Sequence, residues 1–212
     1  MFYMLVPDPN GVVNGNVRTT SFVLERTYSV LAHEFQHLIN DSRRLYVNDA
    51  MVWEDSWLNE GLSHIAEELA FYAASGHTPR QNLGSTPITG EAARMFDRYN
   101  LDNVERYIRY LRMPEDHSLI GNVDELGTRG AIWAFLRYAA DREPGDDAAM
   151  WRRLVNSMTL GLENLEEVIG ANPRDWMHEW EVSVFTDDAG FAIAERYTQP
   201  SWNFRVLTPI LD

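Results

Sequence analysis

Two histidines one helical turn apart mark the part of this sequence that can do chemistry. Residues 32–40 read A-H-E-F-Q-H-L-I-N, within a run of helical periodicity. Side chains at positions i and i+4 of an α-helix share a face, so His33 and His37 can direct two imidazoles at one point, as a zinc ion requires. Glu34 can reach water held on that ion. The alternative is an accidental match, which is rare for three fixed positions in a chain of this length.

A second stretch can complete the site. Residues 57–68 read W-L-N-E-G-L-S-H-I-A-E-E, and a catalytic zinc takes three protein ligands and one water. We predict Glu60 as the third ligand. The alternative is an acidic residue favoured by the dipole of its helix. Glu67 lies two turns later on the same face, where it can hydrogen-bond a ligand imidazole from behind, as carboxylates near zinc commonly do. Glu68 is expected to face solvent.

Together the two stretches resemble the gluzincin metallopeptidases, in which H-E-x-x-H is followed by a W-L-N-E-G helix. The closer pattern, A-H-E-F-Q-H-L-I-N with W-L-N-E-G-L-S-x-x-A-E-E, is similar to the hyicolysin family of neutral metallopeptidases. The resemblance is strong over residues 29–70 and weaker over residues 130–138 and 161–165.

The resemblance implies a zinc-dependent peptidase, most simply an endopeptidase. His33, His37 and Glu60 would bind one zinc ion, and Glu34 would be the general base and acid, activating a zinc-bound water to hydrolyse a peptide bond. The alternative is a catalytically inactive metal-binding or interaction domain that keeps the zinc scaffold. The presence of Glu34 argues against this alternative, because zinc binding alone does not require a carboxylate at that position. The motif that holds a substrate amine in aminopeptidases is not evident.

The residue that stabilises the oxyanion departs from the gluzincin pattern. Such enzymes often use a Tyr or His, commonly a Tyr ahead of a Gly that opens a later helix, but residues 124–130 here read D-E-L-G-T-R-G. We favour Arg129, whose guanidinium is always charged; a surface arginine is the alternative. His64 and His117 also stay open, as does a weak or inactive enzyme. Asn59 and His64 are candidate substrate-pocket residues.

Composition limits the partners. The chain has 212 residues, is 45% hydrophobic and carries a formal charge of −14, which argues against nucleic acid. It has no cysteine, so a zinc site must use histidine and carboxylate. No apolar run is long enough to span a bilayer.

No signal peptide is visible, and residues 1–6 look like a core strand, so we expect a fragment of a longer protein. Only the resemblance supports a secreted location.

The expected fold is α+β and mainly helical, with a zincin-like (thermolysin-like) core. An N-lobe of about residues 1–55 would hold a small strand region and the zinc helix, and residues 56–212 would form a helical C-lobe. Residues 14–18 are expected either as an edge strand that pairs with substrate or as a plain surface loop. An apolar stripe should bury the zinc helix; it consists of Val30, Leu31, Phe35 and Leu38.

Further helices are expected over the remainder of the chain. Their ranges are 56–74, 91–113 with a break near 100–103, 126–142, 147–158, 165–169 and a last helix from Pro173. The tail, residues 191–212, is expected to be extended.

Overall fold

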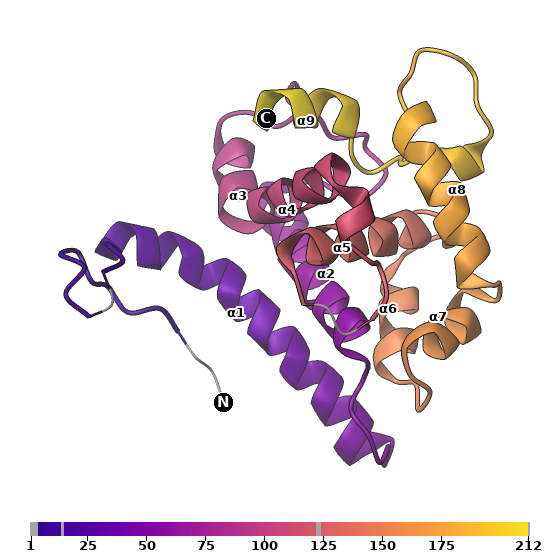
Figure 1. Ribbon diagram of the computed structural model, residues 1–212, viewed down its shortest axis with the longest axis horizontal. Coiled ribbons are helices and arrows are strands. Elements are labelled where there is room, and N and C mark those ends of the chain that lie inside the picture. The colour runs from indigo at the N-terminus through magenta and orange to yellow at the C-terminus, as the bar shows by residue number, and fades with distance from the viewer. Residues whose placement is uncertain (1–3, 14, 122–123, 212) are drawn as a thin grey trace.

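The computed structural model describes residues 4–13, 15–121 and 124–211, and within them the chain is mainly helical. Figure 1 shows a long first helix along one side of a cluster of shorter ones. The α-helices are α1 (Thr20–Ser42), α2 (Ser56–Ser75), α3 (Glu91–Tyr99), α4 (Leu101–Arg112), α5 (Leu126–Ala140), α6 (Ala148–Val155), α7 (Gly161–Ile169), α8 (Pro173–Thr186) and α9 (Phe204–Leu211). Short turns are the π-helix η1 (Arg43–Val47) and the 3₁₀ turns η2 (Pro114–Asp116) and η3 (Glu195–Tyr197).

The core forms around α2 and α5. Every residue from Ala131 to Ala140 is buried, and α5 packs against α4, α2 and α8. Burial on all sides explains why α5 is apolar around its whole circumference rather than on one stripe. α1 packs on the opposite side of α2 from this core and also contacts α3.

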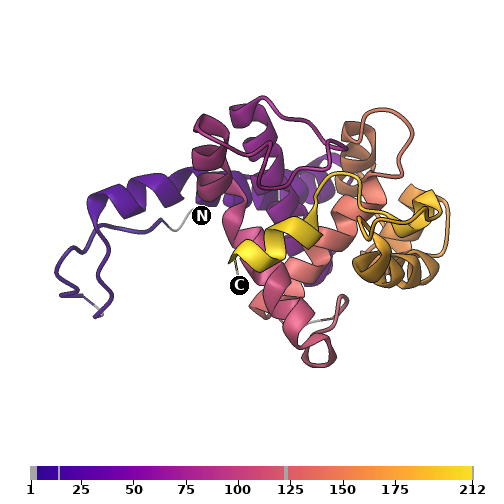
Figure 2. The same ribbon diagram turned by 90° about the horizontal axis from the view of Figure 1, so that it is seen from above.

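The expected N-terminal strand region is wrong. Among the residues that the structure describes, β pairing is confined to two isolated bridges, Asp8 with Arg18 and Leu83 with Trp202. Residues 1–3 and Asn14 lie outside the described part, and residues 4–6 and 15–17 are not strands. Asp8 instead closes a loop, since its carboxylate accepts hydrogen bonds from the backbone N–H groups of Val12 and Val13. This loop extends away from the helices (Figure 2).

The prediction that an apolar stripe buries α1 is also wrong. Leu31, Phe35 and Leu38 are 42%, 58% and 39% exposed. α1 instead turns a mostly polar face, which includes His33 and His37, toward α2. Periodicity placed the apolar residues on one face correctly, but the neighbouring helix covers the other face.

Two smaller expectations are corrected. The tail is not extended throughout, because it ends in α9, where Leu207 is buried. Glu68 does not face solvent; it is fully buried, accepts hydrogen bonds from Arg137, Tyr72 and the indole of Trp202, and ties α2 to α5 and the C-terminal segment. No helix in the described part of the chain combines the length and apolar character needed to cross a membrane.

Candidate metal centre

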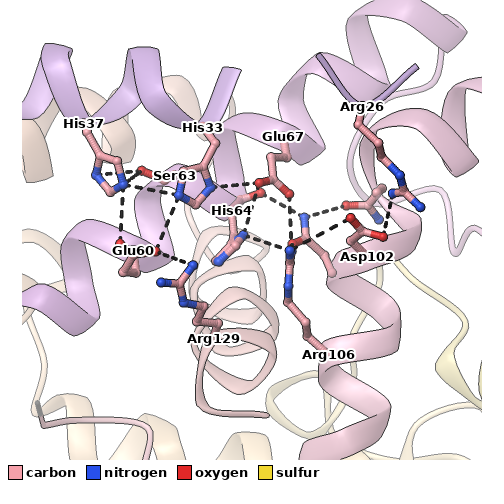
Figure 3. A network of polar contacts seen from close by, with 12 residues as sticks. Arg26, His33, His37, Glu60, Ser63, His64, Glu67, Asp102, Arg106 and Arg129 are labelled. Carbon is pink, nitrogen blue, oxygen red and sulfur yellow. Dashed lines mark hydrogen bonds and ion pairs between the residues drawn. The ribbon is translucent and has the colours of Figure 1, made fainter. Parts of the chain in front are cut away.

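The candidate site lies where α1 packs against α2. His33 and His37 on α1 face Glu60 and Ser63 on α2, and Arg129 approaches from α5 (Figure 3). The i, i+4 spacing within α1 puts the two imidazoles on one face, and packing of α1 on α2 brings that face to Glu60. The sequence spacing therefore sets the pair of histidines, and the helix pair sets the third side chain.

Gly61 allows α2 to approach α5 directly beside Glu60. A Cβ atom at Gly61 would lie 2.3 Å from Cγ2 of Ile132 and 2.7 Å from Cδ1 of Leu136. Both neighbours are buried, so a larger residue would push the two helices apart. The glycine thereby fixes the distance between Glu60 on α2 and Arg129 on α5.

Three side chains present ligand atoms at the spacing of a tetrahedral metal site. The Nε2 atoms of His33 and His37 lie 3.2 Å apart. Oε2 of Glu60 is 3.5 Å from Nε2 of His33, and Oε1 is 3.4 Å from Nε2 of His37. A tetrahedral zinc with bonds of about 2.0–2.1 Å holds its ligand atoms about 3.3–3.4 Å apart. These three residues can therefore hold one such ion.

Hydrogen bonds at the far side of each ring leave both Nε2 lone pairs for a metal. Nδ1 of His33 donates to Oε1 of Glu67 at 2.8 Å. Nδ1 of His37 lies 3.1 Å from the Ser63 hydroxyl, which itself donates to the Asn59 carbonyl and so accepts from the histidine. A hydrogen bond at one ring nitrogen fixes the tautomer and frees the other nitrogen for ligation.

Without a metal, the convergence of these groups shifts their titration. Burial acts to lower the pKa of His33, but the contacts with Glu60 and Glu67 outweigh it and raise the pKa to about 9. Burial acts to raise the pKa of Glu60, but His33, His37 and Arg129 hold that pKa well below its usual range. A buried oxygen of Glu60, Oε2, has no hydrogen bond within the described residues. The metal-free site thus holds a proton where a cation fits.

A second group of possible ligands consists of His33, His64 and Glu67. The 2.8 Å separation of His33 Nδ1 and Glu67 Oε1 is that of a hydrogen bond and is too short for two ligands of one tetrahedral zinc. Burial acts to raise the pKa of Glu67, but His64, His33 and Arg106 lower it to about 2. In this arrangement Oε1 of Glu67 is a hydrogen-bond acceptor behind His33.

Glu34 and Arg129, the two proposed catalytic side chains, differ in how they are held. Glu34 follows His33 on α1, is half-buried, and makes no hydrogen bond or ion pair with a described residue. Arg129 is held by Asp124, which accepts from its Nε and Nη2 at 2.5 and 2.7 Å. Its Nη1 lies 3.1 Å from Oε2 of Glu60. The carboxylate is thus uncommitted, while the guanidinium is fixed against the cluster.

The structure places the two candidate pocket residues differently from each other. His64 is fully buried, with its ring 4.8 Å from that of His33, so it offers no surface to a substrate and the pocket assignment is not supported. Burial is the main cause that lowers the pKa of His64. Asn59 is half-buried and accepts a hydrogen bond from Asn40 at 2.8 Å, which ties α2 to the end of α1. His117, far along the chain, pairs with Glu125.

Two contributors were not anticipated from the sequence. Ser63 lies one turn after Glu60 on α2, and this spacing alone could have placed it on the side that carries Glu60. Arg106 reaches Glu67 and His64 from α4. No local pattern points to Arg106, because its partners are distant in the sequence and meet it only through packing.

A larger groove in the described part of the chain lies away from this cluster. It has a volume of about 980 Å³ and runs between the end of α4 and α8, lined in part by Tyr110, Met177 and Trp180. A small cavity adjoins the cluster and is lined in part by Trp57, Glu60 and Arg129. We identify the candidate site by its ligand geometry, because groove size says nothing about metal chemistry.

No protein-family model, curated protein or solved structure matches this chain at a significant level. The resemblance to the hyicolysin family therefore stays a prediction from the motifs.

Proposed function

We propose that this chain is a zinc-dependent peptidase. One observation carries the proposal: the Nε2 atoms of His33 and His37 and the carboxylate of Glu60 converge at 3.2–3.5 Å, while the opposite nitrogen of each ring is hydrogen-bonded. Three protein ligands are the number that leaves a catalytic zinc one open position. The sequence resemblance supports peptide bonds as the substrate class and a zincin-like arrangement around the site.

In the proposed reaction the side chains of the chain do the positioning and the proton transfer. When bound, zinc supplies a Lewis acid that lowers the pKa of water and polarises a carbonyl. Glu34 takes a proton from the attacking water and delivers it to the leaving amine, as a general base and then a general acid. Its lack of competing partners in the described structure suits this role.

Arg129 is the proposed donor to the oxyanion. Nη1 of a guanidinium carries two hydrogens, and the contact with Glu60 uses at most one of them. The two hydrogen bonds that Nε and Nη2 donate to Asp124 keep the group oriented without using Nη1. A preorganised donor of this kind needs no reorganisation when charge develops on the substrate.

The catalytically inactive alternative has one observation in its favour. A guanidinium against Glu60 offsets the charge of the buried carboxylate without a metal. Measured zinc content distinguishes a peptidase or an inactive zinc-binding domain from a site that binds no metal. Peptide turnover then distinguishes the peptidase from the inactive domain. Endopeptidase action and a secreted location are proposals that rest on the resemblance.

The first experiment measures zinc in the purified chain, alongside Glu60→Ala and the control Glu163→Ala, an exposed acid on α7. We expect close to one zinc per chain in the wild type and the control, and little in Glu60→Ala. Zinc-loaded wild type should cleave a peptide library. Absence of zinc after reconstitution would overturn the proposed function; zinc without cleavage would leave the inactive domain.

A further inference from the structure

A line of alternating charges connects the zinc helix to the carboxylate behind His33. Arg26 on α1 pairs with Asp102 on α4 at 2.6 Å, and Asp102 lies 4.0 Å from Arg106. Arg106 in turn reaches Oε2 of Glu67 at 3.7 Å (Figure 3). These contacts therefore connect Arg26, two turns before His33 on α1, through residues of α4 to Glu67 on α2, which contacts His33.

Glu67 needs a partner of this kind. It is 4% exposed, and its Oε2 has no hydrogen bond within the described structure. Its other oxygen, Oε1, accepts from His33 at 2.8 Å and lies 3.4 Å from Nδ1 of His64. A buried carboxylate is costly unless it is paired, and Arg106 faces the oxygen that the histidines leave unpaired.

Arg106 is itself held in place from several directions. Its Nη1 donates to Oδ1 of Asn103 at 3.1 Å and lies 3.4 Å from Nδ1 of His64. The backbone at Arg106 touches α5, since a Cβ atom at Gly130 would lie 2.3 Å from its carbonyl carbon. The guanidinium thus has little freedom to move away from Glu67.

From this geometry we propose that Arg106 is a positioning residue for the metal site. It holds Oε2 of Glu67, which keeps Oε1 directed at Nδ1 of His33 and leaves Nε2 of that ring facing His37 and Glu60. This inference rests on the proposed function. It adds α4, which contributes no ligand, to the elements that set metal affinity.

The test compares zinc affinity in Arg106→Gln, Arg106→Lys and a matched control, Arg109→Gln, which removes an exposed arginine from the same helix. Dissociation constants come from competition with a chelator at fixed pH, and the unfolding temperature of each metal-free protein is measured in parallel. Loss of a partner behind a metal ligand typically weakens metal binding about 10–100-fold. We expect a loss of that size in Arg106→Gln, a smaller loss in Arg106→Lys and none in Arg109→Gln.

A proton NMR spectrum gives a readout that general destabilisation would not mimic. In the zinc-loaded protein the hydrogen bond to Glu67 should protect the Nδ1–H of His33 from exchange with solvent. This proton should exchange faster in Arg106→Gln but not in Arg109→Gln. If Arg106→Gln does not fold, Arg106→Lys and Asp102→Asn carry the test, since Asp102 is one-third exposed; both should weaken zinc binding in the same direction.

The outcomes separate this inference from the proposed function. Wild type that binds zinc, with equal affinity in the folded Arg106 and Asp102 variants, would overturn the positioning role alone. Wild type that binds no zinc would overturn the proposed function, and the positioning role with it.

Discussion

The Nε2 atoms of His33 and His37 lie 3.2 Å apart. Each ring already has an acceptor for its Nδ1, Glu67 for His33 and the Ser63 hydroxyl for His37. Two lone pairs directed at one point repel each other unless a proton or a metal lies between them.

Glu34→Gln should separate catalysis from metal binding. The change keeps the shape of the side chain but removes its ability to take a proton, and such a loss typically costs about 10²–10⁴-fold in rate. We expect kcat to fall by this amount while zinc content stays at the wild-type value. The measurement is peptide hydrolysis beside metal analysis, with Glu25→Gln, an exposed acid earlier on α1, as control. Full activity in Glu34→Gln would exclude it as the base.

Arg129→Gln should lower turnover with a smaller effect on zinc. Removing an oxyanion donor typically costs about 10²–10³-fold in kcat, whereas Glu60, the proposed zinc ligand, keeps its place on α2. We expect kcat to fall in that range and KM to change little. An equal change in Arg152, an exposed residue of α6, serves as the control. Unchanged turnover would mean that Arg129 only balances the charge of Glu60.

The metal-free protein should lose stability as pH rises from 6.5 to about 9. The folded-state pKa of His33 is raised from 6.5 to about 9, so its contribution is complete below pH 6.5 and is lost as the pH passes the folded value. A shift of this size corresponds to about 3 kcal/mol.

Thermal unfolding in the presence of a chelator measures this effect. About 3 kcal/mol corresponds to a fall of roughly 5–10 °C for a chain of this length. The variant His33→Gln should lack most of the fall, and His178→Gln, which changes an exposed histidine, should keep it. A wild-type unfolding temperature that does not change across this window would contradict the raised pKa.

Gly61→Ala should damage both stability and metal binding. The added methyl group would overlap Ile132 and Leu136 in the interface of α2 and α5, and overpacking of a core typically costs about 1–3 kcal/mol. Because Glu60 is the preceding residue, zinc affinity should also fall. Chemical denaturation and chelator competition measure the two effects.

A double variant tests whether the overlap is the cause. Ile132→Ala removes the side chain nearest the added methyl group, so the cost of Gly61→Ala should be smaller in that background than in the wild type. Equal costs in both backgrounds would show that α2 and α5 accommodate the methyl group in another way.

The sequence by itself determined which residues share a helix face. Periodicity predicted a helix within residues 20–40 and another at 56–74, and α1 and α2 cover both, although α1 is capped by Thr19 rather than by the expected Thr27 or Ser29. The spacing of His33 with His37 follows from 3.6 residues per turn. Such features depend only on neighbouring residues, so no knowledge of the fold is required. The same local rule groups Glu60 with Ser63 and Glu67.

Tertiary structure decided which faces are covered. The apolar stripe of α1 with Leu31 and Phe35 is exposed, and Glu68 is buried although its neighbours in sequence gave no sign of it. The expected N-terminal strand is absent from residues 4–6 and 15–17, since strand formation needs a partner at long range. Arg106 meets Glu67 only because α4 packs on α5 and α5 on α2. Burial and pairing depend on contacts between distant segments, and periodicity carries no information about them.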